Sequence, residues 1–180
     1  MSCCGSSART SAGHTVGAMV VVNALGSALI GAGPHFYAAP LEQGAEFGGL
    51  GFPAVIERAS QAPRWKGMAS TPGVAPPSTT IACVATDARL DKAQAKLLAM
   101  SASAGLARGL RLSHALMDGD TVFAVSTGQR VLCAGMQDLI EIGALAADCV
   151  ARAIARGVYE ARVPGPAWSG PLSWHERFGR

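Results

Sequence analysis

The segment STTIACVATDARLDKAQAKLLAM, residues 78–100, decides the fold of this chain, because a strand pattern in it runs directly into a helix pattern. Residues 79–86 are rich in apolar and β-branched side chains, which favours a buried strand. A helix is predicted over residues 91–110, since Asp91 and Gln94 have the spacing of a capping box. Thr79 and Thr80 open the strand, so a hydroxyl nucleophile at its start is the first functional hypothesis.

A strand, helix, strand order continues beyond this segment. The turn MDGD at residues 117–120 leads into a strand at 121–126 and a loop at 127–129, and a long amphipathic helix is predicted over 137–161. Each helix is expected to bury one face. On the first helix this face comprises Ala93, Leu97, Met100, Ala104 and Ala107, and on the second Ile142, Ala146, Cys149, Ala153 and Gly157.

The N-terminal stretch VGAMVVVNALGSALIGAG, residues 16–33, is almost continuously apolar or small. A membrane helix or the core of a secretion signal is therefore an alternative to a soluble core. Asn23 and the run of three valines favour a buried strand over residues 15–23, followed by a turn and a second short strand.

Residues 31–78 contain seven prolines and many glycines, so we expect a long loop that is either functional or disordered. Residues 162–180 are also rich in proline and glycine, and they are expected to form an irregular tail. A length of 180 residues predicts a single domain.

The charge and the composition of the chain argue against some classes of partner and bound group. The net charge is only +3, 15% of the residues are charged, and basic side chains are scattered, which argues against nucleic acid. Five cysteines without a CxxC pair indicate reduced thiols in a cytoplasmic protein, with Cys83 and Cys149 placed in buried segments. The four histidines are far apart in sequence, so neither a metal site nor a cofactor is expected.

Five blocks carry a resemblance to a known family: TVGAMVVVNALGS, the Gly/Pro-rich loop, STTIACVATDARLDKAQ, LARGLRLSHALMDGDTVFAVSTG and IGALAADCVARAIARGVYEA. In this order they resemble the L-aminopeptidase/D-esterase family of DmpA type, which includes β-peptidyl aminopeptidases and nylon-oligomer hydrolases. The resemblance covers residues 5–161. It implies an α/β fold, the αββα sandwich of the DmpA and ornithine acetyltransferase kind.

The same resemblance implies self-cleavage between Ser78 and Thr79, which makes Thr79 a new N-terminus and the nucleophile. A threonine hydroxyl needs a base, and the α-amine of the same residue can serve, because its reference pKa is about 7.7–8.0. The reaction implied is hydrolysis that releases N-terminal residues from amides, short peptides or esters. Acyl transfer of the ornithine acetyltransferase type is an alternative.

Other family positions fall on Asn23, Asp118 and Asp120. The Asn23 amide would donate to the oxyanion of the tetrahedral intermediate, and the two carboxylates would orient the Thr79 amine and hydroxyl. Without the family, Asn23 could equally be a buried turn residue, and DGD could be a tight turn. Weaker candidates are the hydroxyls of Thr80 and Ser126. His114 is not favoured as a base, because no GxSxG motif accompanies it.

The N-terminal half of the family pattern has no counterpart in this chain. We therefore expect residues 1–78 to correspond to the end of an α-subunit-like part and residues 79–161 to a β-subunit-like part. A separate N-terminal segment or a homo-oligomer would complete the site, with a small peptide or amide as substrate and without a membrane. The alternative is a catalytically inactive remnant or structural subunit of this family.

Overall fold

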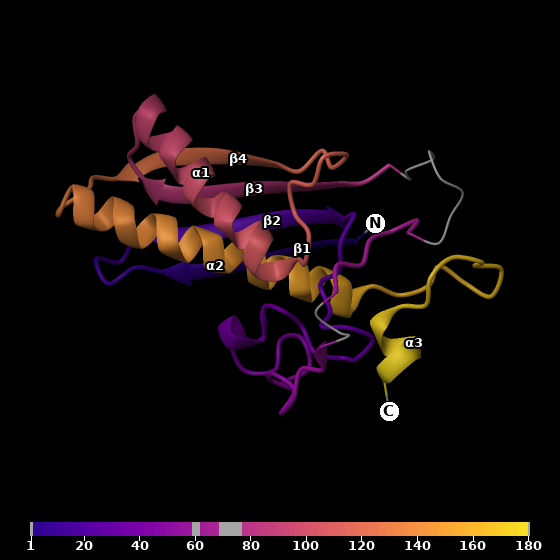
Figure 1. Ribbon diagram of the computed structural model, residues 1–180. Coiled ribbons are helices and arrows are strands. Elements are labelled where there is room, and N and C mark those ends of the chain that lie inside the picture. The colour runs from indigo at the N-terminus through magenta and orange to yellow at the C-terminus, as the bar shows by residue number, and fades with distance from the viewer. Residues whose placement is uncertain (1, 59–61, 69–76, 180) are drawn as a thin grey trace.

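The computed structural model describes residues 2–58, 62–68 and 77–179. Its elements follow in the order β1 Ser2–Arg9, β2 Thr15–Asn23, a 3-10 turn η1 Ala39–Leu41, β3 Thr79–Ala88, α1 Lys92–Gly109, β4 Thr121–Arg130, α2 Met136–Glu160 and α3 Trp174–Phe178. The four strands stand in sequence order in one sheet, and among the neighbouring pairs only β3 with β4 is parallel (Figure 1). The α/β fold predicted from the sequence is confirmed.

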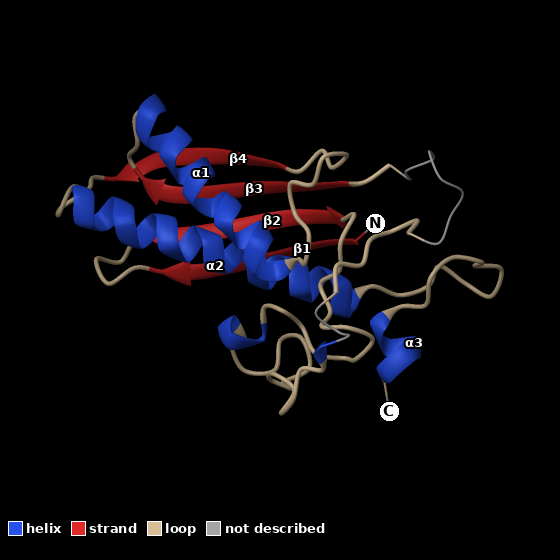
Figure 2. Ribbon diagram, in the orientation of Figure 1, coloured by secondary structure: helices blue, strands red, loops and turns tan. Residues whose placement is uncertain are grey.

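The two faces of the sheet have different environments. Figure 2 shows α1 and α2 on one side of the sheet, and the strand residues that face them are buried, among them Val16, Val20, Ala82 and Val84. Because side chains alternate along a strand, the intervening residues lie on the other face. Exposed apolar side chains there include Met19, Ile81, Phe123 and Val125. The structure thus contains one helical layer and one sheet layer of the αββα arrangement.

Local signals in the sequence locate several elements correctly. Strand β2 has the predicted bounds, so the membrane-helix interpretation of residues 16–33 is wrong. At the start of α1, Asp91 Oδ1 accepts from the Gln94 amide at 2.8 Å, and Gln94 Oε1 accepts from the Asp91 amide at 2.9 Å. This is the predicted capping box. None of the helices in the described ranges combines the length and the apolarity needed to cross a membrane.

Other elements differ from the prediction. Strand β1 was not expected, because SCCGSSAR lacks an apolar alternation, yet it pairs along its whole length with β2. The second short strand expected after residue 23 is replaced by two isolated bridges, Ser27 to Arg111 and Leu29 to Phe36. Strand β4 runs on to Arg130 through the predicted loop at 127–129.

The buried face of α1 is opposite to the predicted one. The five residues predicted to be buried are exposed, and the buried residues are Leu98, Ala102, Gly105, Leu106 and Gly109. Close packing of α1 against α2 explains the difference: a Cβ added at Gly105 would lie 2.2 Å from the Ala147 carbonyl oxygen. The small residues on this face let α1 approach α2 closely, and Leu98 and Leu106 are buried beside them. On α2 the predicted face is buried as expected.

The part of the Gly/Pro-rich loop around Glu46 packs on α2. Glu46 accepts from Arg152 Nε at 2.5 Å and Nη2 at 3.0 Å, and Arg152 Nη1 also donates to the Ser7 carbonyl. Burial would raise the pKa of Glu46, but the hydrogen bonds and the charge of Arg152 outweigh burial, so this pKa lies below its ordinary value. The Glu46–Arg152 pair thus fastens loop, helix and β1 together.

The C-terminal tail, expected to be irregular, contains the five-residue helix α3 with a capping box at Ser173. Its Trp174 stacks on Phe36 and donates from Nε1 to the Pro34 carbonyl at 2.9 Å. All five cysteines are free, but Cys83 is exposed on the open sheet face rather than buried, whereas Cys149 is buried as predicted.

We expect Arg152→Met to lower the free energy of unfolding by about 3 kcal/mol, because the largely buried Glu46 carboxylate would lose both hydrogen bonds from Arg152, and Arg156 Nε at 3.7 Å is too distant to replace them. Urea unfolding monitored by circular dichroism measures this loss. The control is Arg108→Met, which breaks the more exposed pair of Arg108 with Asp148 and should cost less than about 1 kcal/mol. Equal losses in the two variants would contradict the assigned role of the Glu46–Arg152 pair.

Candidate active site

The pairing of β2 with β3 sets the position of the candidate nucleophile. In the antiparallel register Asn23 is the partner of Thr79, so both lie at the same end of the sheet. Thr79 and Asn23 occupy the alternate positions that belong to the open face. Thr80 points to the helical layer instead, where its side chain is fully buried. Of the two threonines, only Thr79 is on the side that a substrate can approach.

The Thr79 hydroxyl lies against the peptide bond that precedes it. Its Oγ1 donates to the Ser78 carbonyl oxygen at 2.6 Å, and the Gly119 amide donates to the same oxygen at 3.2 Å. Ser78 also forms a parallel bridge with Asp118, which holds the junction beside the loop that precedes β4. The carbonyl next to the hydroxyl is therefore polarised by a backbone donor.

Gly119 leaves room for this hydroxyl. A Cβ added at position 119 would lie 2.8 Å from Thr79 Oγ1 and 3.4 Å from its Cγ2. The first distance is shorter than any ordinary van der Waals contact, and the second is at the lower limit of one. The glycine of the DGD motif is thus required by the position of Thr79.

The two carboxylates of DGD differ in their surroundings. Asp120 accepts from the Thr80 amide at 2.7 Å and from the His114 amide at 3.0 Å, so it anchors the start of β3 to the loop. Both oxygens of Asp118 are buried and lack a hydrogen-bond partner of good geometry among the described residues. Burial and the neighbouring Asp120 carboxylate raise the pKa of Asp118 to about 6. A carboxyl group that titrates there can take up and release a proton near neutral pH.

Asn23 contacts the chain just before the junction. Its Nδ2 donates to the Pro77 carbonyl oxygen at 3.2 Å, rather than to the Ser78 carbonyl. Its Oδ1 accepts from Lys66 Nζ at 2.8 Å. The sequence reasoning missed Lys66, because this residue lies in the middle of a loop without a recognisable motif.

The side chains of the two remaining candidates, His114 and Ser126, form hydrogen bonds away from Thr79. His114 Nε2 is 2.8 Å from Ser103 Oγ on α1, so its ring is held against the helix. Ser126 Oγ donates to the Ala88 carbonyl at the opposite end of the sheet. His114 meets the group around Thr79 through its backbone amide, which donates to Asp120, and through the interaction of its ring with the Asp118 carboxylate, whereas Ser126 does not join the group.

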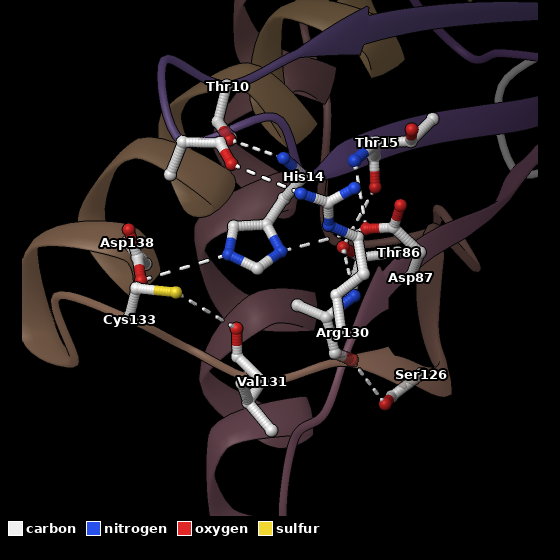
Figure 3. Close-up of polar contacts among 12 residues, drawn as sticks. Thr10, His14, Thr15, Thr86, Asp87, Ser126, Arg130, Val131, Cys133 and Asp138 are labelled. Carbon is white, nitrogen blue, oxygen red and sulfur yellow. Dashed lines mark hydrogen bonds and ion pairs between the residues drawn. The ribbon is translucent and has the colours of Figure 1, made fainter.

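A second polar cluster occupies that opposite end (Figure 3). The buried His14 ring lies between two carboxylates, with Nδ1 3.7 Å from Asp87 and Nε2 3.7 Å from Asp138. The carboxylates in turn accept from the Thr15 and Ala134 amides. Because Thr15 begins β2 and Asn23 ends it, this cluster is separated from Thr79 by the length of the strand. Within the described ranges, no three His, Cys, Asp or Glu side chains are arranged to hold a metal ion.

Three comparisons with known proteins are consistent with each other. An uncharacterized aminopeptidase of Mycobacterium tuberculosis (strain ATCC 25618 / H37Rv) is 37% identical over 167 residues, covering 87% of this chain and 47% of that protein. An uncharacterized aminopeptidase of Mycobacterium leprae (strain TN) is 34% identical over 171 residues, covering 79% of this chain and 40% of that protein. The chain thus spans less than half the length of these relatives.

Among solved structures, the L-aminopeptidase D-Ala-esterase/amidase from Ochrobactrum anthropi, described as a variant of the Ntn hydrolase fold, aligns with a TM-score of 0.52. The alignment covers 98% of this chain and 45% of that chain at 19% sequence identity, so it supports the fold alone. The model of peptidase family S58 matches residues 3–166. This chain therefore belongs to peptidase family S58.

Proposed function

We propose that this chain forms part of a self-processing aminopeptidase or amidase in which Thr79 is both nucleophile and, through its α-amine, base. In the first reaction the Thr79 hydroxyl attacks the carbonyl carbon of Ser78. The new C–O bond replaces the C–N bond, and the hydroxyl proton passes to the departing nitrogen. Water then hydrolyses the ester, leaving a Ser78 carboxylate and a Thr79 with free amine and hydroxyl.

One observation carries this proposal: Thr79 Oγ1 and the Gly119 amide converge on the Ser78 carbonyl oxygen. Attack requires the hydroxyl beside the carbonyl, and the developing oxyanion requires a fixed donor. Both requirements are supported at this one peptide bond. The names of the mycobacterial relatives support an aminopeptidase rather than another hydrolase.

In the second reaction the free α-amine takes the proton of the Thr79 hydroxyl, which attacks the carbonyl of an N-terminal residue in an amide, short peptide or ester. The leaving group accepts that proton, and water releases the acyl group. Asn23 would donate to the oxyanion, and Asp118 and Asp120 would orient the amine. The Asp120 contacts with the Thr80 and His114 amides support a role in fixing this end of β3.

We infer that the substrate pocket forms at the open face of the sheet when another layer covers that face. Thr79 lies at the end of this face, which also exposes Met19, Ile81 and Phe123. An apolar sheet face of this kind is stable when another layer covers it. The covering layer would come from a separate N-terminal segment of the family sequence or from a second copy of the chain.

Self-cleavage is tested by intact-mass measurement of the purified chain. We expect two fragments, residues 1–78 and 79–180, and no cleavage of a Thr79→Ala variant, because that variant lacks the hydroxyl. Aminoacyl p-nitroanilide hydrolysis should disappear in the same variant. A wild-type chain that stays intact would instead support an inactive remnant of the family, and activity surviving in Thr79→Ala would contradict the nucleophile.

Gly119→Ala should slow cleavage about a hundredfold, because the added Cβ would displace the Thr79 hydroxyl from its carbonyl. The time course of fragment formation measures the effect. Gly33→Ala is a matched control, since its Cβ would have ordinary contacts of 3.7 Å or more and should leave the rate unchanged. Equal rates for Gly119→Ala and wild type would show that the hydroxyl does not need this space.

The raised pKa of Asp118 can be tested without catalysis, in the uncut Thr79→Ala variant. The pKa rises from 3.8 to about 6 on folding, so the folded state holds the proton more tightly and loses stability as pH rises from about 4 to about 6. Adding Asp118→Asn removes this loss. The difference in unfolding free energy, double variant minus Thr79→Ala, should therefore increase as the pH is raised from about 4 to about 6. A difference that does not change with pH would contradict the raised pKa.

A further inference from the structure

Lys66 reaches the junction from a part of the chain to which no role is assigned. Its backbone amide donates to the Leu25 carbonyl at 2.8 Å, which ties the loop at residues 62–68 to the chain just after β2. From there its Nζ donates to Asn23 Oδ1 at 2.8 Å and to the Pro77 carbonyl oxygen at 3.3 Å. The anchored backbone and the two side-chain contacts place an ammonium group at the Pro77–Ser78 peptide, next to the Ser78–Thr79 bond in the chain.

The contact with Asn23 fixes the direction of its amide. An ammonium group can only donate, so the side of Asn23 that faces Lys66 must be the oxygen. The nitrogen is then directed toward the junction, where it donates to the Pro77 carbonyl. The Pro77 carbonyl can only accept, so it requires the same orientation, and the two contacts together hold the Asn23 amide from both ends.

The contact with Pro77 restrains the residue before the scissile bond. Its carbonyl oxygen accepts from both Lys66 Nζ and Asn23 Nδ2. Ser78 is held from the other side by the Gly119 amide. The peptide to be attacked is therefore fixed on both sides, and intramolecular attack depends strongly on such alignment.

We propose that Lys66 is a positioning residue for cleavage at Ser78–Thr79, acting through the Asn23 amide and the Pro77 carbonyl. This inference rests on the proposed self-processing function. Lys66 is exposed, so its contribution comes from orientation more than from long-range charge. Arginine can supply the same two donations, whereas methionine has a similar length and supplies none.

The test follows cleavage of the full chain after cell-free synthesis, with fragments quantified by mass spectrometry. We expect Lys66→Met to slow cleavage about tenfold and Lys66→Arg to stay within about threefold of wild type. The matched control is Arg64→Met, a loss of charge on the same loop, which should leave the rate unchanged. Unchanged thermal unfolding midpoints would show that the variants fold.

A second readout reports the positioning itself. In the uncut Thr79→Ala background, Lys66→Met should shift the NMR signals of the Asn23 side-chain amide, and Arg64→Met should not. Cleavage at the wild-type rate in Lys66→Met, or slow cleavage with an unmoved Asn23 signal, would overturn the inference while the proposed function stands. A wild-type chain that never cleaves would overturn the proposed function, and the role of Lys66 with it.

Discussion

The antiparallel register between β2 and β3 is the constraint on which the candidate site depends. It makes Asn23 the partner of Thr79 at the end of both strands. Because side chains alternate, a slip of one residue would turn Thr79 into the helical layer and bring Thr80 to the open face. The buried residues of β2 and β3 prevent such a slip, since it would expose Val16, Val20, Ala82 and Val84. The hydrophobic core thereby fixes the position of a surface hydroxyl.

Elements defined by local chemistry could be predicted from the sequence. The capping box fixes the start of α1, and the valine-rich run gives the bounds of β2. The face of α1 could not be predicted, because leucines lie on two of its faces and the close fit of Gly105 against the backbone of Ala147 is not visible in the sequence. Strand β1 was missed because its pairing with β2, and not its composition, makes it a strand.

The candidate site likewise contains residues that could be predicted from the sequence and residues that could not. The resemblance pointed to Thr79, Asn23, Asp118 and Asp120, and in the structure the last three contact residues 77–80. It could not point to Lys66 or to the backbone amide of Gly119, because their contacts arise only when the loops at residues 62–68 and 110–120 fold against β2 and β3. Arg152 is a parallel case in the core: its burial is explained by Glu46, which lies 106 residues away in the sequence.

The place of β3 in the sheet has a consequence for the proposed processed form. Strand β3 would begin one product and β2 would belong to the other, yet the two strands remain hydrogen-bonded along the register from Val16 to Asn23. A cut at the junction would convert a linked chain into a complex of two polypeptides without separating them. The stability of that complex would then depend on protein concentration, as it does for any dimer whose subunits fold together. Dilution, which leaves the folding of the uncut chain unaffected, would become a variable that controls the active form.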